Sequence, residues 1–355
     1  MDLVDILMEV LERGASDLHL TVGTPPVIRV AGKLIRLDYP RLSSSDTRDL
    51  IYAILSQEQR HRIESDWEID FAYSVPGKAR FRVNAYFQRN SMGAAFRLIP
   101  ATIKSVEELM LPEALHDMTA KPRGFVLVTG PTGCGKSTTL AALIDEINEA
   151  REEHIMTIED PIEFLHRHKK SIVNQREVGT DTQSFSRALK SVLRQDPDVI
   201  LVGEMRDNET IQTALTAAET GHLVFATLHT QDAPQSIDRI IDVFPPHQQG
   251  QVRVQLAATL MGICTQQLLV TVDGTGRVPA CEVLVPTPAV RNLVREAKTH
   301  QIYSVMQTGS QYGMQTMDSS LANLVRRGKI TKELALKRSS TPEDLERLIM
   351  GRMAA

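Results

Sequence analysis

The sequence predicts an α/β protein in which a small mixed α+β domain precedes a larger domain with a mostly parallel sheet. In the first hundred residues, short alternating runs separated by turn residues indicate an antiparallel sheet. From about residue 124 to residue 282, apolar strand-like runs alternate with helical stretches, which is typical of βα units. After Pro286 the apolar spacing is helical to the end, apart from an interruption at 309–313.

Composition limits the classes of function. The chain has 355 residues, of which 42% are hydrophobic, which is enough for two domains. A net charge of -4 gives no support for a nucleic-acid partner. The isolated cysteines Cys134, Cys264 and Cys281 indicate a reducing compartment without structural zinc. An acidic start and short apolar runs predict a cytoplasmic protein that reaches a membrane only through a partner.

The first region is expected to contain helices and short strands. One amphipathic helix should end near Gly14, and Ser45 with Asp46 should cap a second. Ser56 and Gln59 form a capping box for a third helix. Strands are expected at 18–22, 27–30, 69–75, 80–88 and 94–99.

The strand at 80–88 carries an unusual polar face. Arg80 and Arg82 point to the same side, and Arg97 on the next strand could lie close by. Taken alone, this pattern favours a solvated sheet face. The functional alternative is a cluster of arginines that contacts an anion, such as the nucleotide of a neighbouring subunit.

We expect an N-terminal domain at 1–99, a linker at 100–110 and a second domain at 111–355. The segment that starts at Pro100 has the composition of a linker, and Ser105 with Glu108 forms a capping box that should open the next helices.

A glycine-rich turn at 130–137 lies between an apolar strand and a helix-forming run. This strand–turn–Lys–Ser–helix order is the context of a phosphate-binding P-loop, because glycines let backbone N–H groups face phosphates at a helix N-terminus. Lys136 can reach the β- and γ-phosphates of ATP, and the Ser137 hydroxyl can bind Mg²⁺. The residues expected to bind the nucleotide are Gly130, Pro131, Thr132, Gly133, Cys134, Gly135, Lys136, Ser137 and Thr138.

Two further strands end in acidic residues. The run at 155–158 is followed by three carboxylates, the last of which is Glu163, and the run at 198–202 ends in Gly203 and Glu204. Ligands bind at this carboxyl edge of open α/β sheets. We expect Glu204 to hold Mg²⁺ through water, with Gly203 leaving room for the water shell, and Glu163 to position or deprotonate the attacking water. The two glutamates could exchange these roles, and ordinary solvated loops are the structural alternative.

A third strand, at 223–228, is bracketed by His222 and His229. Zinc binding would require further ligands, and a lone histidine is more often structural. Two histidines that flank a strand of the same sheet are better explained as sensors of the γ-phosphate or as switch residues.

Four motifs together resemble the secretion ATPase superfamily, which drives type II secretion, type IV pili and related machines. They lie at 130–137 (Walker A box), 157–163 (Asp box), 193–207 (Walker B) and 220–230 (His box). This resemblance implies a PAS-like α+β N-terminal domain followed by a RecA-like P-loop ATPase domain with a helical C-terminal tail. It also implies a ring hexamer with ATP sites at subunit boundaries, so Arg80, Arg82 and Arg97 become candidates to complete a neighbour's site.

Within the superfamily the chain is most similar to pilus retraction motors. The stretch 289–296 resembles their AIRNLIRE helix, with Val290 and Val294 where isoleucine is usual, and 15–20, 174–179 and 243–249 resemble other signatures. The implied partners are the inner-membrane pilus platform protein and the pilus-extension ATPase. A pilus-extension or secretion ATPase is the nearest alternative, which the lack of a four-cysteine zinc module disfavours. A nucleic-acid translocase or an ATP-binding regulator without turnover is less favoured.

Overall fold

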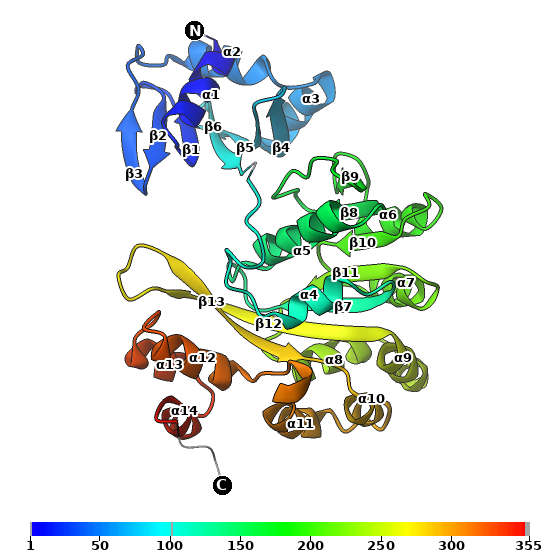
Figure 1. The fold of residues 1–355 in the computed structure, drawn as a ribbon. Helices are drawn as coiled ribbons and strands as arrows, with labels where there is room; N and C mark the ends of the chain where they lie inside the picture. The colour runs from blue at the N-terminus through cyan, green and yellow to red at the C-terminus, as the bar shows by residue number, and fades with distance from the viewer. Residues whose placement is uncertain (1, 101, 352–355) are drawn as a thin grey trace. The chain divides into compact units, whose positions relative to one another are not determined.

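The computed structural model describes residues 2–100 and 102–351. Contacts between residues divide the chain into two compact units, Met1–Thr102 and Ile103–Ala355. The predicted α/β class is confirmed, since each unit is built around its own sheet (Figure 1).

The N-terminal unit contains a six-stranded sheet of order β3-β2-β1-β6-β5-β4 in which all neighbouring strands are antiparallel. Apolar residues of its helices pack with one face of the sheet, and Phe81 and Val83 of β5 are fully buried in that core. Arg82, between them, is exposed on the other face. The elements are α1 (Leu3–Glu12), β1 (Asp17–Leu20), β2 (Val27–Val30), β3 (Lys33–Arg36), α2 (Ser44–Tyr52), α3 (Gln57–Asp66), β4 (Glu68–Val75), β5 (Ala79–Gln88) and β6 (Ser91–Ile99).

The N-cap predicted for the third helix is confirmed, whereas the N-cap of the second helix lies at a different residue. The Ser56–Gln59 capping box is confirmed at the start of α3. The cap predicted for the second helix was wrong, because α2 begins two residues earlier, where Ser43 and Asp46 bond reciprocally.

The Ser105–Glu108 capping box also forms, but no helix begins there, and the first helix before the P-loop strand is α4 (Ala114–Thr119). Glu108 donates its N–H to the Ser105 hydroxyl, and its carboxylate accepts from the Ser105 N–H. Only turns follow, and Met110 has a positive φ of 56°. Pro112 lies two residues further on, and proline disfavours helix in the residue before it.

The C-terminal unit contains a seven-stranded sheet of order β13-β12-β7-β11-β10-β8-β9. Its strands are parallel except for β13, which pairs with β12 as an antiparallel edge. Helices α4 and α5 pack on one face, and α6 to α9 pack on the other (Figure 1). The elements are α4 (Ala114–Thr119), β7 (Gly124–Thr129), α5 (Lys136–Ala150), β8 (His154–Glu159), β9 (Ile172–Glu177), α6 (Phe185–Val192), β10 (Val199–Val202), α7 (Asn208–Glu219), β11 (Leu223–Leu228), α8 (Ala233–Asp242), α9 (Pro246–Thr259), β12 (Leu260–Val270) and β13 (Arg277–Leu284).

The rest of this unit is helical, as expected. It comprises α10 (Pro288–Arg295), η1 (Thr299–Gln301), α11 (Ile302–Thr308), η2 (Ser310–Tyr312), α12 (Met317–Arg326), α13 (Lys332–Arg338) and α14 (Pro342–Ile349). Val290 and Val294 of α10 are buried in the core. The Arg291 guanidinium donates to the carbonyl oxygens of Ala257 and Ala258, which fastens α10 to the end of α9.

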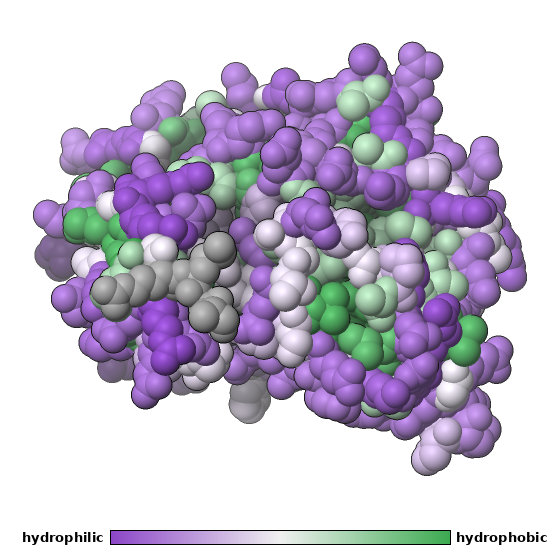
Figure 2. All heavy atoms as spheres, turned by 60° about the horizontal axis from the view of Figure 1, so that its bottom comes forward, coloured by the Kyte–Doolittle hydropathy of each residue, from purple (hydrophilic) through white to green (hydrophobic). Residues whose placement is uncertain are grey.

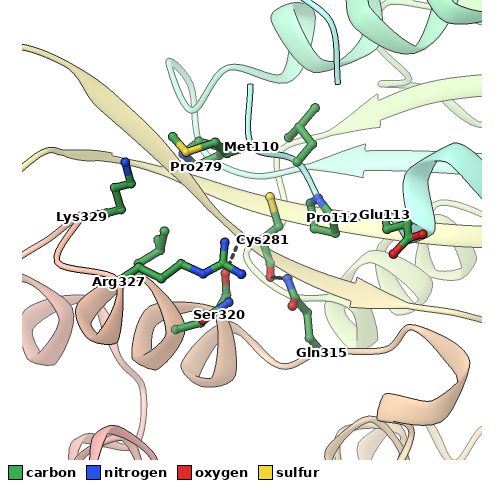
Figure 3. A pocket seen from close by; sticks show the side chains of 12 residues that line it. Met110, Pro112, Glu113, Pro279, Cys281, Gln315, Ser320, Arg327 and Lys329 are labelled. Atoms are coloured by element: carbon green, nitrogen blue, oxygen red, sulfur yellow. Dashed lines mark hydrogen bonds between the residues drawn. The ribbon is translucent and has the colours of Figure 1, made fainter. Parts of the chain in front are cut away.

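Side chains close the β13 edge of the sheet. Ser320 Oγ accepts a hydrogen bond from the Cys281 N–H at 3.0 Å, and Gln315 Nε2 donates to the Cys281 carbonyl at 2.7 Å (Figure 3). A hollow of about 230 Å³ lies beside this edge, and Arg327 and Lys329 are among its lining residues. None of the residues predicted for the nucleotide site lines this hollow.

The surface drawn in Figure 2 is mainly hydrophilic, with hydrophobic side chains gathered in a limited area of that face. Within the part of the chain that the structure describes, no helix has the length and apolar character needed to cross a membrane.

Candidate active site at the carboxyl edge of the parallel sheet

The glycine-rich turn joins the buried strand β7 to α5. Gly130, Gly133 and Gly135 all have positive φ, at 138°, 79° and 93°. Gly135 is the N-cap of α5, where no side chain caps the helix and no acidic residue lies in the first turn. The N–H groups at the start of α5 are therefore available to bind an anion, which the positive end of the helix dipole also favours.

Lys136 lies over this turn and faces acidic residues. Its ammonium donates to the carbonyl oxygens of Gly130 at 2.8 Å and Pro131 at 3.2 Å. Burial lowers the pKa of Lys136, whereas the nearby groups Cys134, Glu204 and Glu163 oppose that shift. The structure thus brings together the lysine and both predicted catalytic glutamates.

Glu204 follows β10 and is held by two partners. Its carboxylate forms a two-pronged ion pair with Arg206, at 2.7 Å for each prong, and lies 3.3 Å from Nε2 of His229. The Arg206 hydrogen bond is the main reason that the pKa of Glu204 is lowered, with His229 and Lys136 adding to it. Glu204 is therefore ionised at neutral pH and suited to interact with a cation.

The glycine before Glu204 packs tightly against the neighbouring strand β8. A Cβ at Gly203 would lie 3.1 Å from the carbonyl oxygen of Ile158 and 3.3 Å from the Cα of Glu159. Gly203 also donates its N–H to Ile158 at 2.7 Å. Close approach of β8 therefore disfavours a larger residue here, and the predicted room for a metal's water shell stays a prediction.

The carboxylates at the end of β8 and on the loop after it lie in different environments. Glu159, the last residue of β8, is half-buried, and burial raises its pKa, while Thr157, Gln175 and the backbone of Glu163 hydrogen-bond to it. Glu163 is exposed on the following loop. Glu159 is thus part of the framework, and Glu163 is the carboxylate of this loop that influences Lys136.

The neighbouring edge strand β9 fastens this loop, a role that the sequence did not reveal. Gln175 donates to the Phe164 carbonyl at 2.8 Å and accepts from the His166 N–H at 2.9 Å. Glu177, which is 4% exposed, accepts from the Ile162 N–H at 3.1 Å. Polar residues inside a strand were the available signal, but their partners lie 9 to 15 residues away in the chain.

The two histidines lie at opposite ends of β11. His229 follows its carboxyl end, beside Glu204, whereas His222 precedes its amino end and pairs there with Gly124. Six residues at about 3.3 Å each separate these ends by roughly 20 Å. His222 Nδ1 instead lies 2.9 Å from the Ala217 carbonyl at the end of α7. The expectation that both histidines reach one γ-phosphate in the same subunit is corrected, and only His229 is at this edge.

The three predicted arginines lie on the same side of the N-terminal sheet, where Arg82 and Arg97 are exposed and Arg80 is half-buried. Arg82 on β5 pairs in register with Arg97 on β6, and Arg97 with Asp17 on β1. Arg97 Nε donates to Asp17 at 2.9 Å, although 74% of the arginine side chain remains exposed. Arg80 lies two residues before Arg82 on the same strand, opposite Ile99.

The oxygen groups near the turn fit a magnesium nucleotide better than a metal held by protein alone. Among residues 2–100 and 102–351, no group of three or more histidine, cysteine or acidic residues could hold a metal ion. Ser137 in the first turn of α5 and Glu204 supply hard oxygen donors. Mg²⁺ prefers a few such ligands together with water and phosphate oxygens.

Comparison with known proteins places the chain in a family. The model of the Type II/IV secretion system protein family matches residues 2–277. The chain is 52% identical over 344 residues to the type IV pilus retraction ATPase PilT of Pseudomonas aeruginosa, covering 97% of this chain and 100% of that protein. It is also 52% identical over 320 residues to a twitching motility protein of Neisseria gonorrhoeae, covering 90% and 86%.

A solved structure agrees with these matches. The crystal structure of the pilus retraction motor PilT with bound ADP superposes with a TM-score of 0.91 and 51% identity, covering 98% of this chain and 99% of that one. The predicted RecA-like ATPase fold is confirmed. The chain therefore belongs to the Type II/IV secretion system protein family, and it is an ATPase of that family.

Proposed function

We propose that the chain is the ATP-hydrolysing motor that powers retraction of type IV pili and hence twitching motility. Hydrolysis is supported by one arrangement above all, in which Glu204 and Glu163 act electrostatically on Lys136 of the P-loop and His229 contacts Glu204. Retraction is supported by near full-length similarity to relatives named for pilus retraction and twitching. A relative with bound ADP supports nucleotide binding.

The site residues have separate roles in this proposal. The N–H groups of residues 130–138 and the Lys136 ammonium bind the phosphates of ATP. Glu163 orients the attacking water and accepts its proton, and His229 keeps Glu204 in place beside the γ-phosphate. Mg²⁺, which Ser137 and Glu204 would hold, supplies charge neutralisation of the β- and γ-phosphates.

A neighbouring subunit completes the site in our proposal. Arg80, Arg82 and Arg97 lie on one side of the N-terminal sheet, from which they would stabilise the phosphate charge of the next subunit's ATP. The proposed domains are 1–99 and 111–355, joined by a linker at 100–110. ATP closure and release would then move one domain against a neighbour's.

The implied assembly is a homohexamer that acts in the cytoplasm at the inner face of the membrane. Its proposed partners are the platform protein of the pilus machine and the pilus-extension ATPase, and no nucleic acid is involved. The retraction assignment is tested by deleting the gene in the source organism. Loss of twitching with surface pili retained supports retraction, whereas loss of the pili themselves means that the chain drives extension.

A further inference from the structure

Gln266 is a polar residue buried beside the P-loop. It lies on β12, which pairs in parallel with β7 up to Thr265 and Thr129, the residue before the glycine-rich turn. Only 1% of Gln266 is exposed. A buried amide must be hydrogen-bonded to avoid a penalty, so the partners of this side chain show what it does.

Both ends of the Gln266 amide bond to the nucleotide-binding segment. Oε1 accepts a hydrogen bond from Thr139 Oγ1 at 2.8 Å, and Nε2 donates to the carbonyl oxygen of Cys134 at 2.6 Å. These partners fix the orientation of the amide, because a carbonyl can only accept. Gln266 therefore connects the turn and the first helical residues of α5 to the neighbouring strand.

Two glycines of the turn pack directly against Gln266. A Cβ at Gly130 would lie 2.3 Å from the backbone oxygen of Gln266, and a Cβ at Gly135 would lie 3.1 Å from its Nε2. The turn therefore approaches Gln266 on both sides of the Cys134 peptide. Strand β12 therefore packs closely against the glycine-rich turn, in addition to pairing with β7 in the sheet.

The bond to Cys134 has a consequence for phosphate binding. The Cys134 carbonyl and the Gly135 N–H belong to one planar trans peptide, so they point in opposite directions. Gln266 holds the carbonyl toward the core. The Gly135 N–H is therefore directed away from the core, toward the space where the turn at 130–137 would bind phosphate. We propose that Gln266 is a positioning residue of the nucleotide site that presents the Gly135 N–H to phosphate.

This inference rests on the proposed function, since it assumes that the turn binds a nucleotide. A residue that only stabilised the fold would change the affinity for adenosine and for ADP by the same factor. A residue that orients a phosphate-binding N–H should act on ADP alone. The comparison of the two ligands therefore separates positioning from stability.

The test uses the full chain with Gln266→Met, which keeps the side-chain length and removes both hydrogen bonds. Gln267→Met is the matched control, because its side chain lies on the opposite face of the same strand and is half-buried. Isothermal titration with ADP and with adenosine gives the dissociation constants. We expect the ADP constant to rise about tenfold in Gln266→Met, as loss of one well-placed hydrogen bond would cause, with less than about twofold change for adenosine.

Equal ADP affinity in the wild type and Gln266→Met would overturn the inference, as would an equal loss for both ligands. If Gln266→Met does not fold, Thr139→Val is used instead. This substitution removes the hydrogen bond to Oε1 of Gln266 and keeps the volume of residue 139. ADP should then bind about threefold more weakly with adenosine unchanged, and no change would contradict us. Absence of ADP binding by the wild type would instead reject the proposed function.

Discussion

Nε2 of His229 lies 3.3 Å from Oε1 of Glu204. These residues follow two neighbouring strands, β11 and β10, which run parallel and end at the same edge of the sheet. The contact couples the His box to the Walker B carboxylate beside Lys136. A change at the γ-phosphate that moved one of them would therefore also affect the other.

Glu204→Gln should leave ATP binding largely intact and reduce hydrolysis. The amide keeps the size of the side chain but removes the charge that attracts Arg206, His229 and the proposed Mg²⁺. We expect kcat to fall by about 10²-fold or more with a much smaller change in nucleotide affinity. Steady-state phosphate release and nucleotide titration measure the two effects. Glu209→Gln on the exposed side of α7 is the matched control, and equal turnover in the two variants would contradict the assignment of Glu204.

Arg206→Gln should shift the pH dependence of hydrolysis. The Arg206 hydrogen bond lowers the pKa of Glu204, so removing the arginine raises that pKa toward its ordinary value. If ionised Glu204 is required, activity lost at low pH should be lost at a higher pH in the variant. The measurement is kcat against pH for both proteins. If kcat of the variant falls at the same acidic pH as kcat of the wild type, Glu204 does not determine the loss of activity at low pH.

Local sequence patterns predicted most of the framework. β2 lies at the predicted 27–30, and the Ser56–Gln59 capping box forms as expected. Both signals act within a few residues and therefore survive tertiary packing. The P-loop was equally readable, because the strand, the glycines with positive φ and the helix are contiguous in the chain.

Features that depend on distant partners were not predicted. Arg206 neighbours Glu204 in sequence, but only the structure shows that it pairs with that carboxylate. Gln266 contacts Cys134 across 132 residues, and no local pattern marks that bond. His222 and His229 were predicted to share one site because they flank the same strand. An extended strand holds the residues at its two ends far apart, so only one of them can reach the carboxyl edge.

Gln175→Met should loosen the loop that carries Glu163. The amide bonds to Glu159 at the end of β8 and to the Phe164 carbonyl and the His166 N–H on the loop that follows. Losing these bonds should lower the free energy of unfolding by about 1 to 3 kcal/mol and also lower kcat. Chemical denaturation and phosphate release test the two effects. If Gln267→Met causes the same losses, the effect is not specific to this loop.

Glu282 joins the β13 edge to two helices. Its Oε1 accepts from the Ala233 N–H at the start of α8 at 2.8 Å, and the Met317 backbone at the start of α12 also bonds to it. Burial raises the pKa of Glu282 to about 7, and Asp232 and Asp318 add to the shift. This carboxyl is therefore partly protonated near neutral pH in the folded chain.

Glu282→Gln should make the C-terminal unit less sensitive to rising pH. Between the ordinary pKa of 4.5 and about 7, the folded wild type keeps a proton that the unfolded chain releases, so wild-type stability falls as pH rises through this window. The fall attributable to Glu282 is at most about 3 kcal/mol, from 1.36 kcal/mol per pKa unit. The difference in free energy of unfolding, variant minus wild type, should therefore grow from about pH 5 to about pH 8 in urea titrations. Glu152→Gln, at an exposed position, supplies the control for removing a surface carboxylate. A pH-independent difference for Glu282→Gln would mean that the carboxyl is ionised throughout and that its bonds to the two helix starts outweigh its burial.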